Sequence, residues 1–233
     1  FMRKAFTLAE VLITLGIIGV VAAMTLPSLI ERNRRAELQN GLKAAYSLLQ
    51  QALQRMNADY GYTILPSDYK ARKFKPEYIK YFDNPVDCQW GGIHATKKST
   101  LCGKGATVNG DDGSSMDLMG IYKIYNKSSN KFAGSSYFDD GQFALKNGML
   151  IMIENITPLF ITVDVNGIQK KPNVWGEDLF TFQLMDNGKL LPMGAQGTNF
   201  SPDSYCSKTS TNQYNGIACT YKALTDKDYW NGI

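Results

Sequence analysis

The chain has 233 residues, of which 44% are hydrophobic, and its formal net charge is only +4. A charge this small does not predict a nucleic-acid partner, and the basic pairs Lys97-Lys98 and Lys170-Lys171 are typical of a solvated surface. The residues show no phosphate loop, no dinucleotide fingerprint and no serine–histidine–acid arrangement, so the sequence predicts no enzyme.

The first thirty residues combine a long apolar run with one early acidic residue. No residue from Val11 to Ile30 carries a charge, and this length is about the 20 residues that a helix needs to cross a membrane. Glu10 lies at the start of the run, where a carboxylate is unfavourable in lipid. A plain membrane anchor has no use for Glu10, whereas a helix that leaves the lipid to meet a cationic partner does.

These residues resemble the N-terminus of type IV prepilins and type II secretion pseudopilins. Met2-Arg3-Lys4-Ala5 is similar to their short basic leader, and Phe6 to Leu15 is similar to the segment that follows the cut. The resemblance implies cleavage between Ala5 and Phe6 by a prepilin peptidase and N-methyltransferase, which also methylates the new amino group. The chain departs from the usual pattern in two places, because Ala5 stands where glycine is usual and Phe1 precedes Met2.

The resemblance also implies a function and a set of partners. Glu10 is expected to meet the N-terminal ammonium of a neighbouring subunit, and Pro27 falls where pilins commonly carry a helix-bending proline. The chain is then a structural subunit of a type IV pilus-like or pseudopilus filament. Its expected partners are other subunits, the processing enzyme, the inner-membrane assembly platform and, before assembly, membrane lipid. It is expected to cross the bacterial cytoplasmic membrane once, with its C-terminal domain outside, and then to join a periplasmic pseudopilus or a surface pilus.

Two other interpretations of the N-terminus stay open. A secretory signal peptide would use Arg3 and Lys4 as its basic region and would be cut near Ala23, releasing a soluble binding domain. An uncleaved single-pass anchor would keep the whole apolar run. Glu10 and the continuation of the run past Ala23 argue against the signal peptide.

The predicted fold class is α+β, with a long N-terminal helix packed on an antiparallel β-meander. The segments are a leader at 1–5, a membrane or filament-core helix at 6–30 and an exported pilin-like domain at 31–233. Within that domain we expect an amphipathic helix at about 31–59, an irregular region at about 61–119, a β-sheet region at about 120–193 and a C-terminal disulfide loop at about 200–233.

One long helix is predicted from about Thr7 to Asp59, with Gly16, Gly19 and Pro27 interrupting its first half. Its second half carries one apolar stripe at spacings of three and four residues, formed by Leu38, Leu42, Ala45, Leu49, Ala52 or Leu53, and Met56. Pro27 removes one helical hydrogen bond, so we expect the helix to bend or loosen near it.

The four cysteines form two local pairs, Cys88 with Cys102 and Cys206 with Cys219. Neither spacing is that of a zinc site, and the chain has a single histidine, His94. An even count in an exported domain predicts disulfides. Four cysteines allow three connectivities, and we predict the local one.

The strand signals begin in the middle of the chain. Strands are predicted at Gly120–Tyr125, Gln142–Lys146, Gly148–Glu154, Leu159–Val165 and Leu179–Met185. Asn147-Gly148 and Asn187-Gly188 have the composition of tight hairpin turns. The alternation of Phe180, Phe182 and Leu184 with polar neighbours predicts a half-buried strand.

Asp164, Asn166 and Asp178 form the one metal hypothesis that the sequence suggests. Carboxylate and amide oxygens around Gly167 are ligands that Ca²⁺ prefers, although no cofactor is required by the resemblance. The alternative is a tight turn that these side chains cap, with Gly167 in the left-handed conformation. The sequence favours the turn over the calcium site.

The acidic pairs Asp111-Asp112 and Asp139-Asp140 stand beside glycines. We expect them to be turn residues rather than paired catalytic acids. His94 lies near Cys88 and Cys102 in the sequence, but an oxidised cystine is no nucleophile.

Overall fold

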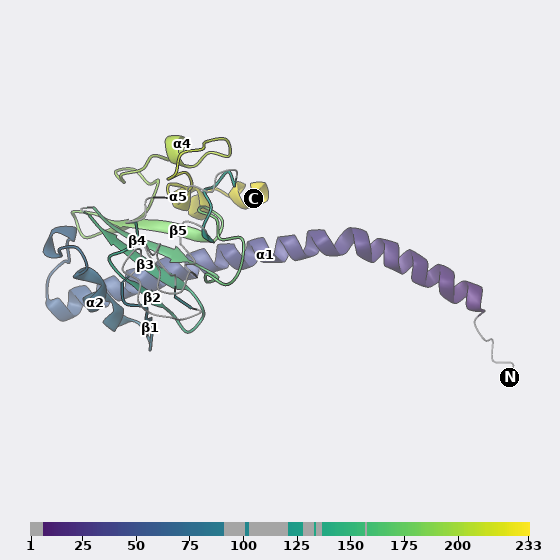
Figure 1. Ribbon diagram of the computed structural model, residues 1–233, viewed down its shortest axis with the longest axis horizontal. Coiled ribbons are helices and arrows are strands. Elements are labelled where there is room, and N and C mark those ends of the chain that lie inside the picture. Colours follow the sequence, from purple (N-terminus) through teal and green to yellow (C-terminus); the bar gives the residue numbers. More distant parts are fainter. Residues whose placement is uncertain (1–6, 91–100, 103–120, 128–132, 134–136, 157) are drawn as a thin grey trace, which may run out of the picture. The chain divides into compact units, whose positions relative to one another are not determined.

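The computed structural model describes residues 7–90, 101–102, 121–127, 133, 137–156 and 158–233. Contacts divide the chain into two compact units, Phe1–Glu37 and Leu38–Ile233. Helix α1 (Leu8–Tyr60) begins in the first unit and ends in the second (Figure 1). The predicted long helix is therefore confirmed to within a residue at each end, and the helix continues through Pro27. The bend at Pro27 stays a prediction.

The second unit is built on one six-stranded sheet in which each strand pairs antiparallel with the next along the chain. The strands are β1 (Val86–Asp87), β2 (Gln142–Ala144), β3 (Leu150–Asn155), β4 (Leu159–Asp164), β5 (Leu179–Leu184) and β6 (Leu190–Pro192). Both predicted Asn-Gly hairpins are confirmed, and Gly148 and Gly188 have positive φ values of 93° and 74°. The predicted α+β meander is therefore confirmed.

One face of the sheet packs against the part of α1 that belongs to the second unit. The buried residues of α1 are the predicted stripe: Leu38, Leu42, Ala45, Leu49, Ala52, Leu53 and Met56. They form a core with alternate strand residues, among them Ile151, Ile161 and Phe182. A Cβ at Gly41 would lie only 3.2 Å from the Val165 side chain, so glycine lets the helix approach the end of β4 closely.

The other face of the sheet is covered as well, which corrects the expectation of a half-buried strand. All six residues of β5 are buried. A second core places Trp175, Phe138 and Ile217 against this face. Thr181, expected to face solvent, accepts a hydrogen bond from Trp175 Nε1 at 3.0 Å and lies 2.8 Å from the hydroxyl of Thr162. Strands buried on both faces need a second layer, and here loops supply it.

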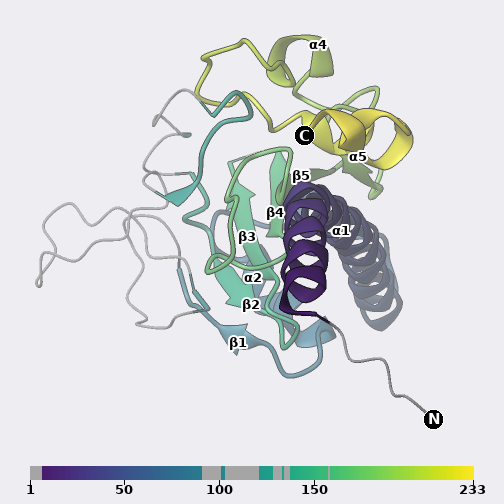
Figure 2. The ribbon, with the colours of Figure 1, turned by 90° about the vertical axis from the view of Figure 1, so that its right-hand side faces the viewer.

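Short helices surround the sheet. They are η1 (Pro66–Asp68), α2 (Phe74–Tyr78), η2 (Ile79–Tyr81), α4 (Pro202–Tyr205), α5 (Cys219–Thr225) and η4 (Tyr229–Gly232). The first three and β1 lie in the region expected to be irregular. Figure 2 shows α4 and α5 beyond β5, and α5 contacts that strand.

Two sequence expectations have clear outcomes in these segments. The local disulfides Cys88–Cys102 and Cys206–Cys219 are both formed, and the described residues contain no free cysteine. The predicted strand Gly120–Tyr125 is wrong. Its described residues, 121–125, make a single parallel bridge from Lys123 to Val174, and two residues later the Tyr125 N–H donates to the Asn215 carbonyl oxygen in another segment.

Candidate functional site

The start of α1 is a capping box formed by Thr7 and Glu10. The backbone N–H and the hydroxyl of Thr7 each donate a hydrogen bond to Glu10 Oε2 at 2.8 Å. The Glu10 N–H donates in return to Thr7 Oγ1 at 3.3 Å. Such a reciprocal pair satisfies two of the N–H groups that every helix leaves without a partner at its start. Glu10 therefore has a local structural role.

The sequence carries this signal as the Thr-x-x-Glu spacing of Thr7 and Glu10, which reasoning from the cost of a carboxylate in lipid alone misses. Ala5 and Phe6, the residues at the expected cleavage point, lie outside the described residues. Their processing stays a prediction.

The first unit exposes apolar side chains around the whole circumference of α1. Exposed fractions run from 41% at Val11 to 77% at Leu8 and Met24. The other members of this apolar surface are Leu12, Ile13, Leu15, Ile17, Ile18, Val20, Val21, Leu26, Leu29 and Ile30. By length and composition, this is the one described helix able to cross a membrane. A helix that is apolar all round requires lipid or other chains to cover it.

The few hydroxyl groups within this apolar surface are satisfied by the helix itself. Thr14 Oγ1 donates to the Glu10 carbonyl oxygen at 2.9 Å, and Thr25 Oγ1 donates to the Val21 carbonyl oxygen at 2.9 Å. Ser28 Oγ donates to the Thr25 carbonyl oxygen at the same distance. Polar groups paired within the segment are compatible with an environment that contains no water.

Asp164 and Asp178 are both buried and close enough for their charges to interact, and both side chains cap turns. Asp164 Oδ1 accepts hydrogen bonds from the N–H groups of Asn166 and Gly167, and Oδ2 accepts one from Tyr122 Oη at 2.7 Å. Asp178 accepts one on each oxygen, from the N–H groups of Asn173 and Val174, both at 2.7 Å.

This geometry fits the predicted turn. Gly167 has a φ of +85°, and all four carboxylate oxygens already have donors. Every oxygen of the two carboxylates therefore caps a backbone N–H or accepts from Tyr122, as the predicted turn requires, whereas Asn166 Oδ1 has no hydrogen-bond partner among the residues that the structure describes. Calcium at Asp164, Asn166 and Asp178 stays a prediction.

Burial dominates the electrostatics of this carboxylate pair. Burial raises the pKa of Asp164 to about 6, against the lowering effect of its hydrogen bonds. Burial and then the neighbouring Asp164 charge raise the pKa of Asp178 well above its usual range. Two carboxylates so close in a core resist being charged together.

A third group of acids combines the pair Asp139-Asp140 with Glu154. Oxygens of the three carboxylates lie within 4.8 Å of one another. Burial raises the pKa of Glu154 to about 8 and also raises that of Asp140. Burial, followed by the charge of Glu154, raises the pKa of the adjacent Tyr137. The sequence interpretation of Asp139-Asp140 as turn residues omits this partner. Asp111-Asp112 and His94 lie outside the described residues.

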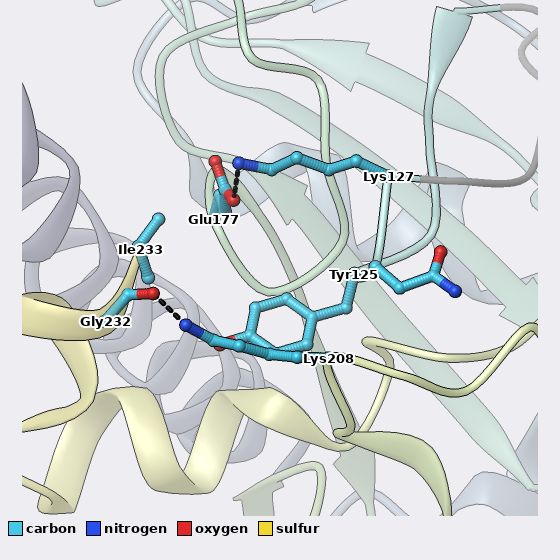
Figure 3. A pocket seen from close by; sticks show the side chains of 7 residues that line it. Tyr125, Lys127, Glu177, Lys208, Gly232 and Ile233 are labelled. Carbon is cyan, nitrogen blue, oxygen red and sulfur yellow. Dashed lines mark hydrogen bonds and ion pairs between the residues drawn. The ribbon is translucent and has the colours of Figure 1, made fainter.

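A small polar cavity lies near the C-terminal end of the described chain (Figure 3). Its volume is about 190 Å³, and Tyr125, Lys127, Glu177 and Lys208 are among its lining residues. Lys127 Nζ lies 2.5 Å from Glu177 Oε1, and Lys208 Nζ donates to the Gly232 carbonyl oxygen. Its charged groups thus bind one another, and its described lining contains no nucleophile beside a base.

Comparison with known protein families finds a match at the N-terminus of the chain. The family model described as the prokaryotic N-terminal methylation motif matches residues 1–26. The chain carries a prepilin-type motif. No curated protein and no solved structure matches the chain.

The prepilin-type motif covers the basic leader, Ala5, Phe6, Glu10 and most of the apolar surface of α1, and it ends at Leu26. It belongs to a class of filament subunits whose role is typically structural. The motif thus agrees with the site built from the residues: a capped helix with one acidic side chain at its start and an apolar surface that needs covering.

Proposed function

We propose that this chain is a structural subunit of a type IV pilus-like or type II secretion pseudopilus filament. A prepilin peptidase cleaves it between Ala5 and Phe6, and α1 then leaves the membrane to pack against the helices of neighbouring subunits. The observation that carries the proposal is the match to the methylation motif on a helix whose apolar side chains are exposed all round.

The chemistry of the proposed assembly follows from the same residues. Leu8, Val11, Leu12, Leu15, Ile18 and Val21 supply apolar surface for helix packing in the filament core. Glu10 compensates the N-terminal ammonium of Phe6 on an adjacent subunit. The second unit, with its own two-sided core, faces outward. Before assembly, the apolar surface lies in the cytoplasmic membrane, and an inner-membrane platform extracts the chain.

The test is intact-mass and N-terminal peptide analysis of the protein from its native membrane, without reductant. We expect a mature chain that begins with N-methylated Phe6. A chain that begins near Met24 would identify an ordinary signal peptide and a released soluble domain. A chain that keeps its leader in a host with active prepilin peptidase would identify a plain anchor. Either result would overturn the filament proposal.

A further inference from the structure

A second cavity lies beside Asp139, Asp140 and Glu154, and the proposed function makes no use of it. Its volume is about 470 Å³, and Tyr137 and Tyr214 form part of its wall. Glu154 comes from β3, whereas the two aspartates precede β2. In this hairpin Gln142 pairs with Met152, and continuing the register by two residues brings Asp140 level with Glu154. The sheet itself therefore assembles the cluster.

The backbone holds two of the three carboxylates in place. The Phe138 N–H donates to Glu154 Oε2 at 2.5 Å, and the Asn155 N–H donates to Asp140 Oδ2 at 2.7 Å. Glu154 is 2% exposed and Asp140 is 3% exposed. The carboxylates are thus fixed before any ligand arrives, which is the condition for a preorganised site.

Arg72 faces this cluster. Arg72 Nη2 lies 3.2 Å from Asp139 Oδ2, and Arg72 Nε lies 3.9 Å from Asp140 Oδ1. Arg72 brings one positive charge to three carboxylates in a largely buried place. Buried charges are costly unless further partners compensate them.

Tyr137 gives an independent indication of a ligand. Its side chain is more than nine-tenths buried and lines the same cavity, near Glu154. Its hydroxyl makes no hydrogen bond to any residue that the structure describes. Buried polar groups are nearly always hydrogen-bonded, and a water molecule held by a bound ion would supply the missing acceptor.

We propose that Asp139, Asp140 and Glu154 bind one Ca²⁺ ion, with water completing its coordination. Ca²⁺ accepts six to eight oxygen ligands in flexible geometry, whereas Mg²⁺ demands a near-ideal octahedron. The cavity has room for several water molecules beside the ion. The ion ties the turn before β2 to β3, and its positive charge adds to that of Arg72 beside the three carboxylates. This site is distinct from the turn at Asp164 and Asp178.

The experiment uses the full chain in detergent, stripped of metal with EDTA. Tb³⁺ is titrated with excitation of the aromatic residues, because Tyr137 and nearby Trp175, whose ring centroids are 6.0 Å apart, can sensitise its emission. CaCl₂ then displaces Tb³⁺, and the Ca²⁺ dissociation constant is expected at about 10⁻⁴–10⁻³ M, as in extracellular modules. MgCl₂ is expected to displace it at least tenfold less effectively.

Matched variants locate the site. Asp139→Asn and Glu154→Gln should each weaken Ca²⁺ binding at least tenfold. Asp83→Asn removes the same charge from an exposed pair with Lys146, and its affinity should not change. Asp164→Asn should also retain the wild-type affinity.

Three results would overturn the proposal. The first is that CaCl₂ does not displace Tb³⁺ at concentrations up to about 10 mM, which is well above the range of extracellular sites. The others are an unchanged Ca²⁺ affinity in Asp139→Asn and a loss of Ca²⁺ binding in Asp164→Asn. Melting curves in EDTA show whether each variant folds. If Glu154→Gln does not fold, Asp139→Asn decides. The Asp139 side chain is more exposed than that of Glu154, and the hydrogen bonds from Phe138 and Asn155 end on Glu154 and Asp140 instead.

Discussion

Replacing Glu10 by glutamine separates the two roles that this carboxylate has at the start of α1. Glutamine at the same position of a capping box can still bond back to the helix start, so the Thr7 cap survives. The negative charge is lost. Glu10→Ala removes both, and Thr7→Ala removes the capping hydroxyl while it keeps the charge.

The expected sizes of the two effects differ enough to be told apart. Loss of the Thr7 cap costs about 1 kcal/mol of helix stability, a factor of about five. Loss of an ion pair at about 4 Å in a medium of intermediate polarity lowers an association constant by roughly two to three orders of magnitude. We therefore expect Glu10→Gln to enter filaments almost as poorly as Glu10→Ala, and Thr7→Ala to enter them nearly normally.

The assay compares the membrane and filament fractions of cells that express each variant. The amount of chain in membranes should be the same for all four proteins, since the apolar surface of α1 is unchanged. The amount recovered in sheared filaments or in cross-linked oligomers reports assembly. Wild-type assembly of Glu10→Gln together with defective Thr7→Ala would show that Glu10 acts only as a cap, and the charge argument would be refuted.

Three further predictions concern the second unit. Cys206→Ser opens a disulfide that spans 13 residues and should cost about 3 kcal/mol, seen as faster proteolysis of the C-terminal loop. Gly167→Ala should lower the melting temperature strongly, because its Cβ would lie 2.3 Å from the Gly148 carbonyl oxygen. Gly61→Ala is the matched control: it has a similar φ but lies in open space, so it should lower the free energy of unfolding by only about 1 kcal/mol. Leu49→Ala removes a fully buried side chain and should cost about 2–5 kcal/mol in denaturant unfolding.

Each of these has a result that would contradict it. Unchanged protease resistance in Cys206→Ser would show that the disulfide does not stabilise the loop. Equal melting temperatures for Gly167→Ala and Gly61→Ala would mean that the backbone near Gly148 moves aside. A Leu49→Ala protein as stable as the wild type would show that α1 is not held by its buried stripe.

The elements that could be predicted are those that residues close together in the sequence specify. The stripe on α1 repeats over five turns, and both Asn-Gly turns specify their own backbone, so the helix and two hairpins could be predicted. The burial of Thr181 could not, because Trp175, Phe138 and Ile217 cover this face of the sheet from loops that the alternation along a strand does not place. β1 is too short to carry a periodicity, and it forms only as an edge beside β2.

The cluster of Asp139, Asp140 and Glu154 could be predicted only in part. Asp139-Asp140 and Glu154 are far apart in sequence, but the predicted hairpin at Asn147-Gly148 joins them. A two-residue turn at Asn147-Gly148 would place Asp140 opposite Asn155, whereas the observed register, with Gln142 opposite Met152, places it opposite Glu154. What the register cannot give is the depth of burial, which comes from the loops around the cavity.

The cap and the proposed assembly contact do not compete for the same oxygen of Glu10. Both hydrogen bonds that this carboxylate accepts from Thr7 end on Oε2. A carboxylate has two oxygens and about four lone-pair sites, so Oε1 stays available to an ammonium from a neighbouring chain. The cap also fixes the side chain in one orientation, which reduces the entropy lost when that contact forms. Under the proposed function, the capping box thus orients the Glu10 carboxylate for the contact with the neighbouring ammonium, and α1 keeps its first turn at Thr7 when that contact forms.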